Sequence, residues 1–138
     1  MYKPTKNKEV VYPELSYKIV GILFEVCRNL GSNHREKYYQ EAVKNELIKN
    51  KIKFKEQLYL PLDYKGNKIG KYFLDFLVED KIILELKKGS IFHRQNIDQV
   101  LSYLKTSNLK LGIIANFTRE GVKFYRVLNI KWIVCSFV

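Results

Sequence analysis

Three charged side chains interrupt apolar stretches of this sequence at short spacing. Asp75 is the one charge within FLDFLV, and Glu85 and Lys87 alternate with apolar residues in IILELK. Burying a charge is costly unless the group is paired or binds a metal. Two carboxylates and an ammonium at this spacing could bind a hard divalent cation and stabilise negative charge on a phosphate.

Both stretches have the pattern of β-strands, and a short loop separates them. The period of two in residues 82–87 places Glu85 and Lys87 on the same face of the strand. If residues 79–81 form a three-residue hairpin loop, position 75 lies opposite position 85, and directly opposed residues point to the same face. The sequence therefore predicts that the carboxylates of Asp75 and Glu85 are neighbours.

Two like charges at this distance repel, so a positive group must lie between or beside them. One candidate is Lys87 and the other is Mg²⁺ (or Mn²⁺), to which the backbone carbonyl of Leu86 could add a ligand. Lys87 would then orient the attacking water or stabilise charge developing on a phosphate. The alternative is a structural salt bridge of Lys87 with Asp75 or Glu85 on a solvent-facing sheet surface, and spacing alone leaves both open.

The elements around these residues predict an α/β domain. Helical spacing of apolar residues covers 13–30, 35–50 and 94–106, and strand patterns cover 53–60, 71–78, 82–87, 109–117, 122–128 and 130–138. Pro61 is expected to end the first strand, and Lys65-Gly66-Asn67 to form a turn. Helices on both sides of a mixed sheet would bury this apolar content. We expect one domain over residues 13–138, after a basic, poorly ordered arm over residues 1–12.

Composition indicates the kind of partner and compartment. The 138 residues carry a net charge of +11, which favours a polyanion such as nucleic acid, although a lysine-rich compositional bias gives the same excess. Cys27 and Cys135 lie in apolar stretches and are expected to be buried thiols, which suits a reducing, cytoplasmic location. The longest apolar stretches are too short to span a bilayer, so no membrane partner is expected.

A wider set of residues, in this order, resembles the GxxExxxY proteins, a branch of the PD-(D/E)XK nuclease superfamily. The set comprises Gly31, Glu36, Tyr39, Asp75, Glu85-Leu86-Lys87, Gln99, Tyr103 and LGIIANF at 111–117. The resemblance covers roughly residues 15–128. It implies a restriction-endonuclease-like core, in which a mixed central β-sheet is flanked by α-helices.

The resemblance also implies roles for individual residues. The implied catalytic residues are Glu36, Asp75, Glu85, Lys87, Gln99 and Tyr103, and the implied metal ligands are Glu36, Asp75, Glu85 and Leu86. Glu36 would be an additional acid from an N-terminal helix, and Gln99 and Tyr103 would form a Q-xxx-Y element on the helix after the core strands. Simpler interpretations remain: Glu36 as a favourable acid at a helix start, and Gln99 with Tyr103 as a pair at the edge of the core.

The expected function is a Mg²⁺- or Mn²⁺-dependent nuclease that hydrolyses phosphodiester bonds, with DNA favoured over RNA as the substrate. A non-catalytic module that keeps the nuclease fold and binds nucleic acid or a protein partner is the alternative. Superfamily members often dimerise to cut both strands, so the resemblance is compatible with a homodimer, but the sequence does not give the oligomeric state.

Overall fold

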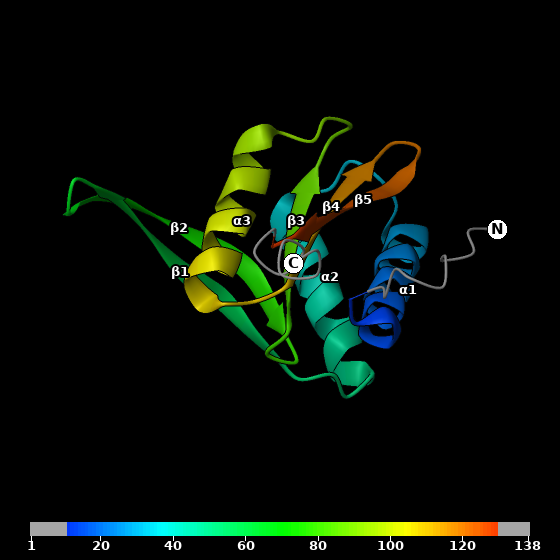
Figure 1. The fold of residues 1–138 in the computed structure, drawn as a ribbon. Helices are drawn as coiled ribbons and strands as arrows, with labels where there is room; N and C mark the ends of the chain where they lie inside the picture. The colour runs from blue at the N-terminus through cyan, green and yellow to red at the C-terminus, as the bar shows by residue number, and fades with distance from the viewer. Residues whose placement is uncertain (1–10, 130–138) are drawn as a thin grey trace, which may run out of the picture.

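The computed structural model describes residues 11–129, which form three helices and one five-stranded sheet (Figure 1). The elements are α1 (Pro13–Leu30), α2 (Glu36–Lys49), β1 (Phe54–Tyr64), β2 (Asn67–Val78), β3 (Ile82–Lys88), α3 (Arg94–Ser107), β4 (Leu111–Thr118) and β5 (Gly121–Leu128). Their order and type confirm the expected α/β class. Most of the expected basic arm and the final strand pattern at 130–138 lie outside the described residues.

The strands lie side by side in chain order, from β1 at one edge of the described sheet to β5 at the other. β3 and β4 are parallel, and every other pair of neighbours is antiparallel, so the sheet is mixed as expected. A parallel pair needs a crossover connection, which α3 provides. β4 is buried along its whole length because helices cover both faces of the sheet.

Two apolar clusters fill the two faces of this sheet. On one face, α1 and α2 pack against Leu84 of β3, and on the other, α3 packs against Ile83. Consecutive residues of β3 thus serve opposite layers, as a period of two requires. α3 lies so close to β4 that a Cβ added at Gly112 would be 2.5 Å from a methyl carbon of Val100. The helices therefore flank the sheet as the sequence predicted.

The first hairpin corrects the expectation that Pro61 ends a strand. β1 continues to Tyr64, with Pro61 opposite Lys71. A proline is tolerated in an edge strand because one side of that strand needs no N–H donor for a neighbour. Lys65 and Gly66 form the expected turn, and both have positive φ (48° and 80°), which suits a two-residue type I′ loop. The resulting hairpin is long and twisted, and its tip projects beyond α3 (Figure 1).

The expected alternation along residues 53–60 is also interrupted. Gln57 has a positive φ of 51°, and the residues on its two sides serve different layers. Phe54 packs against the α1–α2 side of the sheet, whereas Leu58 belongs to the α3 side. Near Gln57, which lies directly across from Asp75, the apolar side chains of β1 therefore switch from the α1–α2 side of the sheet to the α3 side.

Two observations concern the expectations drawn from composition. Cys27 is only half-buried, at the margin of the cluster beneath α1, and Cys135 lies outside the described residues. Within residues 11–129, no helix is both long enough and apolar enough to cross a membrane.

Candidate active site

The side chains of Asp75 and Glu85 meet where β2 and β3 diverge. The three-residue loop pairs Val78 with Ile82, and the register continues to Phe76 and Leu84, which is the register that the sequence predicted. The two carboxyl groups lie within hydrogen-bonding reach of each other. Asp75 is 6% exposed and Glu85 is 3% exposed, so the pair is not on a solvent-facing surface.

Two donors hold the carboxylate of Asp75. The backbone N–H of Leu86 donates to Oδ2 at 2.7 Å, and Nε2 of Gln40, on α2, donates to Oδ1 at 2.8 Å. The backbone pairing of β2 with β3 ends at Phe76 and Leu84, although both strands continue. In an extended strand the N–H and C=O of one residue leave on the same side. The carbonyl of Leu86 therefore faces the acid pair, where a metal ligand was expected.

The charge of Glu85 is strongly disfavoured in this setting. Burial and the contact with Asp75 raise the pKa of Glu85 to about 10, Glu36 raises it further, and Lys87 opposes the shift. Glu85 therefore binds its proton more tightly than a solvent-exposed glutamate does. The proton relieves the repulsion that a cation would otherwise have to relieve.

Lys87 and Glu36 lie at the border of the acid pair, and both are half-buried. Each acts on Glu85 through its charge, which places both in its vicinity. The ion pairs among residues 11–129 do not include Lys87, so the surface salt bridge that the sequence left open is not formed. Within the same range, no three His, Cys, Asp or Glu side chains converge closely enough to hold a metal ion. Glu36 is therefore near the pair without completing a three-acid group.

The two candidates on α3 lie on the helix that covers the Ile83 face of the sheet. Tyr103 is half-buried against the cluster on that face, and Gln99 is half-buried one turn earlier. In the part of the chain that the structure describes, neither forms a hydrogen bond to Asp75 or Glu85. The structure thus places Gln99 and Tyr103 in the layer over the site but does not bring them into contact with the acid pair.

Gln40 contacts the site and was not among the predicted residues. It lies four residues after Glu36 on α2, so the two share one face of the helix. That spacing is the signal that could have identified it. Tyr39, between them in sequence, points the other way: its hydroxyl donates to the carbonyl of Gly31 at 2.7 Å, and its ring stacks on Phe117 at 4.1 Å. Tyr39 therefore fixes the start of α2 against β4.

Asn116 is a second residue that sequence reasoning missed. It pairs in register with Lys87 and is almost fully buried. Its Nδ2 donates to the carbonyls of Gly89 and Ile91 at 3.1 and 3.0 Å, which holds the loop that follows Lys87. Its Oδ1 is buried and has no hydrogen-bond partner among the described residues. Asn116 thus fixes the chain immediately after the candidate catalytic lysine.

The donor set around Asp75 fits a hard divalent cation. All the candidate ligands are oxygens: the two buried carboxyl groups, which contact each other, and the carbonyl of Leu86. Mg²⁺ and Mn²⁺ prefer such ligands and commonly use one or two carboxylates with water for the remaining positions. The residues present therefore suit the cation that the sequence predicted.

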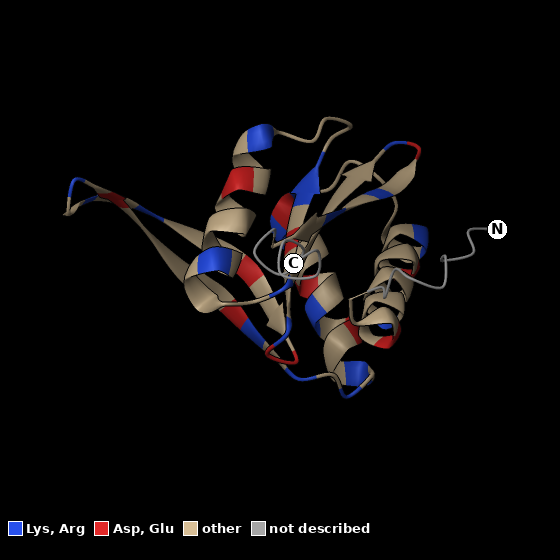
Figure 2. Ribbon diagram, viewed as in Figure 1, with Lys and Arg blue, Asp and Glu red and all other residues tan. Residues whose placement is uncertain are grey.

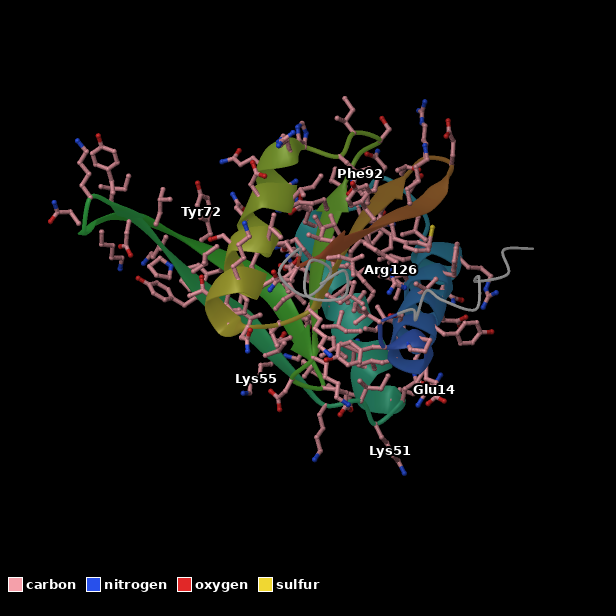
Figure 3. The ribbon with its side chains drawn as sticks, viewed as in Figure 1. Glu14, Lys51, Lys55, Tyr72, Phe92 and Arg126 are labelled. Carbon is pink, nitrogen blue, oxygen red and sulfur yellow. The ribbon has the colours of Figure 1, made fainter. Side chains whose placement is uncertain are left out.

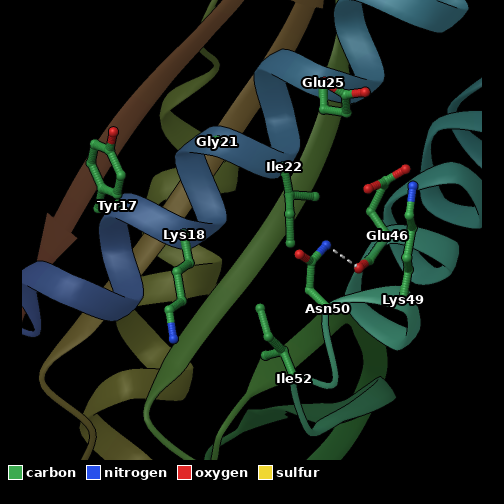
Figure 4. Close-up of a pocket in the computed structure, with 9 residues that line it drawn as sticks. All are labelled: Tyr17, Lys18, Gly21, Ile22, Glu25, Glu46, Lys49, Asn50 and Ile52. Atoms are coloured by element: carbon green, nitrogen blue, oxygen red, sulfur yellow. Dashed lines mark hydrogen bonds between the residues drawn. The ribbon is translucent and has the colours of Figure 1, made fainter.

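A separate pocket of about 410 Å³ lies between α1 and α2 (Figure 4). Its lining includes cations and acids in equal measure, Lys18 and Lys49 with Glu25 and Glu46. None of the candidate catalytic residues lines it. The chemistry of the acid pair therefore does not involve this pocket.

Comparison with known proteins gives a family and several similar solved structures. A model of the PD-(D/E)XK nuclease superfamily matches residues 13–127. No curated protein matches the sequence. The crystal structure of SSO0001 aligns with a TM-score of 0.53 and 16% identity, covering 83% of this chain, which spans only 58% of that protein. The crystal structure of an alkaline exonuclease (LHK-Exo) from Laribacter hongkongensis aligns with a TM-score of 0.49 and 11% identity, covering 92% of this chain and 75% of that one.

Proposed function

Because this chain belongs to the PD-(D/E)XK nuclease superfamily, we propose that it is a Mg²⁺- or Mn²⁺-dependent nuclease that hydrolyses phosphodiester bonds in DNA. The observation that carries the proposal is the buried contact between the carboxyl groups of Asp75 and Glu85, with Lys87 beside them. The narrower GxxExxxY branch, which the sequence resembles, is part of the same proposal.

Asp75, Glu85 and the carbonyl of Leu86 would hold the cation, with Glu36 as a more distant acid. When bound, the cation would supply Lewis-acid stabilisation of negative charge on the scissile phosphate. Gln40 orients Asp75 by donating to one of its oxygens, which leaves the carboxylate fixed relative to β3. A donor that holds a metal ligand in this way commonly affects metal affinity as much as activity.

Lys87 would act on the substrate itself. It follows Glu85 by two residues on the same face of β3, which puts its ammonium one strand step from the acid pair. From there it would orient the attacking water and stabilise the charge that develops on the phosphate oxygens. Gln99 and Tyr103 of α3 would contact the substrate on the Ile83 side of the sheet.

The charge of the chain supports a nucleic-acid substrate. The net charge is +11, and basic residues lie at the tip of the hairpin, at both ends of α3 and at the end of β3 (Figure 2). Such an excess attracts a polyanion to the domain before specific contacts form. We include a cytoplasmic location and a homodimer in the proposal.

The experiment is a cleavage assay with purified protein, Mg²⁺ or Mn²⁺, and linear, nicked and single-stranded DNA, with RNA in parallel. We expect Lys87→Ala and Asp75→Asn to reduce the cleavage rate about 100-fold or more, as removal of a charge-stabilising group commonly does. Lys88→Ala is the matched control, because Lys88 is the exposed neighbour of Lys87 on the same strand.

If wild type and Lys87→Ala are equally inert on all these substrates, the enzymatic proposal fails. Nucleic-acid binding with steep salt dependence but without cleavage would then identify the chain as a binding module with a nuclease fold. Cleavage of RNA in preference to DNA would correct the substrate and leave the chemistry in place.

A further inference from the structure

One face of the projecting β1–β2 hairpin exposes aromatic rings beside lysines. Tyr59 and Phe73 are directly opposite each other on β1 and β2, with ring centroids 5.9 Å apart. They are 45% and 49% exposed, which is unusual for two neighbouring rings in a small domain. We call Tyr59, Phe73, Lys68 and Lys71 the aromatic–lysine face.

Each ring of this face has an ammonium above it. Lys68 lies 5.0 Å from the ring centre of Tyr59, and Lys71 lies 5.7 Å from that of Phe73. At the turn, Lys65 lies 5.5 Å from the ring centre of Tyr64. Residues 59–73 contain three lysines and a single acid, Asp63. The hairpin thus combines flat apolar surfaces with positive charge at the same positions.

The opposite face of the hairpin belongs to the body of the domain. Leu58 and Leu74 are buried in the cluster beneath α3, and the hydroxyl of Tyr72 accepts a hydrogen bond from Gln95 at 3.4 Å. Figure 3 shows Tyr72 on the hairpin beside α3. The core therefore explains why one face of these strands is apolar, but it does not explain the exposed rings of Tyr59 and Phe73.

The aromatic–lysine face lies next to the candidate active site along β2. Phe73 precedes Asp75 by two residues on β2, which corresponds to about 7 Å along an extended strand. A nucleotide strand with one phosphate at the acid pair would reach the hairpin within about one or two nucleotides, since the contour spacing per nucleotide is of similar size. The position of the hairpin thus suits the part of a substrate adjacent to the cleaved bond.

We propose that the aromatic–lysine face binds unpaired nucleotides of the substrate next to the cleavage site. Bases would stack on Tyr59 and Phe73, and Lys68 and Lys71 would contact the neighbouring phosphates. Stacking on a side chain requires a base whose face is free, which favours a single-stranded segment over an intact duplex. This inference rests on the proposed nuclease function and assigns it a substrate-binding element.

A second copy of the chain is the competing occupant, because β1 is an exposed edge strand. Charge argues against it, since two copies of the hairpin would bring six lysines together if each contributes its three. Pro61 also removes a backbone donor from the edge along which a second strand would pair. A polyanion is attracted by these lysines and does not need a backbone donor from β1.

The test measures binding without cleavage. Each variant is made in the Lys87→Ala background. Fluorescence anisotropy then reports its affinity for a labelled single-stranded DNA of about 20 nucleotides, which is longer than the site size of typical single-strand binding domains. We expect Tyr59→Leu with Phe73→Leu to weaken binding about 10-fold or more, because stacking is lost while apolar cover of the hairpin is kept. Lys68→Gln with Lys71→Gln should reduce the slope of log affinity against log salt by about 1.4.

The matched control is Tyr17→Leu with Phe24→Leu, two exposed aromatic residues (81% and 51%) on α1. This pair should bind the probe within about twofold of the parent protein, since it lacks the adjacent lysines of the hairpin. Thermal unfolding of each variant verifies that the hairpin substitutions leave the domain folded.

The inference is overturned if the Tyr59–Phe73 variant binds as tightly as its parent, or if the parent binds no single-stranded probe. It is also overturned if that variant only converts a dimer to a monomer in sedimentation velocity, which would identify a second copy as the occupant. Cleavage by wild type with unaltered binding by the variant removes the inference but keeps the nuclease proposal. If binding depends on the hairpin but neither wild type nor any variant cleaves, the nuclease proposal is removed and the role of the aromatic–lysine face in binding is kept.

Discussion

The carboxylate of Asp75 accepts the backbone N–H of Leu86 at 2.7 Å, at the point where the pairing of β2 with β3 ends. If the register continued, Leu86 would lie opposite Leu74, and the backbone of β2 would supply the acceptor. The side-chain carboxylate of Asp75 accepts the N–H of Leu86 instead. The sheet opens there, and two carboxyl groups and a backbone carbonyl share the space that results.

Glu85→Gln should change how stability depends on pH. The pKa of Glu85 is raised from 4.5 to about 10 in the folded protein, so the folded state retains a proton that the unfolded chain releases above about pH 4.5. The free energy of unfolding must therefore fall as pH rises through this interval. Glutamine removes that dependence, so between about pH 5 and pH 8 the stability difference should shift in favour of the variant by about 1.4 kcal/mol per pH unit. Urea unfolding at several pH values without divalent ions measures this, and equal slopes for both proteins would contradict it.

Binding of Mn²⁺ or Mg²⁺ should release protons. A cation that binds Asp75 and Glu85 displaces the proton between them, so affinity should rise with pH and about one proton should leave per ion bound near neutral pH. Calorimetry in two buffers with different ionisation enthalpies counts the protons. Asp75→Asn should abolish binding, whereas Asp63→Asn on the exposed hairpin should leave it unchanged. Binding to Asp75→Asn with the affinity of wild type would place the ion elsewhere.

Gln40→Ala should weaken both metal binding and cleavage. Gln40 donates to Asp75 at 2.8 Å, and loss of a hydrogen bond to a charged group commonly costs about 1.5–3 kcal/mol, or roughly 10- to 100-fold. Gln95→Ala is the control, because its contact with Tyr72 is long and exposed. A Gln40→Ala protein with full metal affinity and full activity would show that Asp75 needs no support from α2.

Tyr39→Phe should lower stability and leave the acid pair intact. The substitution keeps the ring that stacks on Phe117 but removes the donor to the carbonyl of Gly31. Loss of a buried hydrogen bond of this kind costs roughly 1 kcal/mol. Urea unfolding should show that decrease, while the affinity for Mn²⁺ remains that of wild type. An equal loss of metal affinity would instead make Tyr39 part of the site.

Gly112→Ala should destabilise the contact between α3 and β4. The added Cβ would lie 2.5 Å from a methyl carbon of Val100, whose β-branched side chain has little freedom to move. Overpacking of this kind costs roughly 1–3 kcal/mol. The double variant with Val100→Ala should be more stable than the sum of the two single effects predicts. Strict additivity in urea unfolding would show that the two positions are not in contact.

The local pattern of the sequence was sufficient for the order of the elements and for the pairing of Asp75 with Glu85. Helical and strand periodicity identified each described element, and the three-residue loop at 79–81 fixed the register of β2 on β3. A register follows from loop length because both strands are rigid and adjacent in the chain. The expected course of β1 past Pro61 was wrong because a proline ends a central strand but not an edge strand, and the sequence did not reveal which strand is at the edge.

What only the tertiary structure decided is how distant elements meet around that pair. Gln40 reaches Asp75 across 35 residues of sequence, Glu36 stops short of a three-acid group, and Gln99 and Tyr103 remain in the layer above. Periodicity states which face of an element a side chain occupies, but the distance between two faces depends on how helices pack on the sheet. The raised pKa of Glu85 likewise required the full packing, because burial is a property of the whole fold.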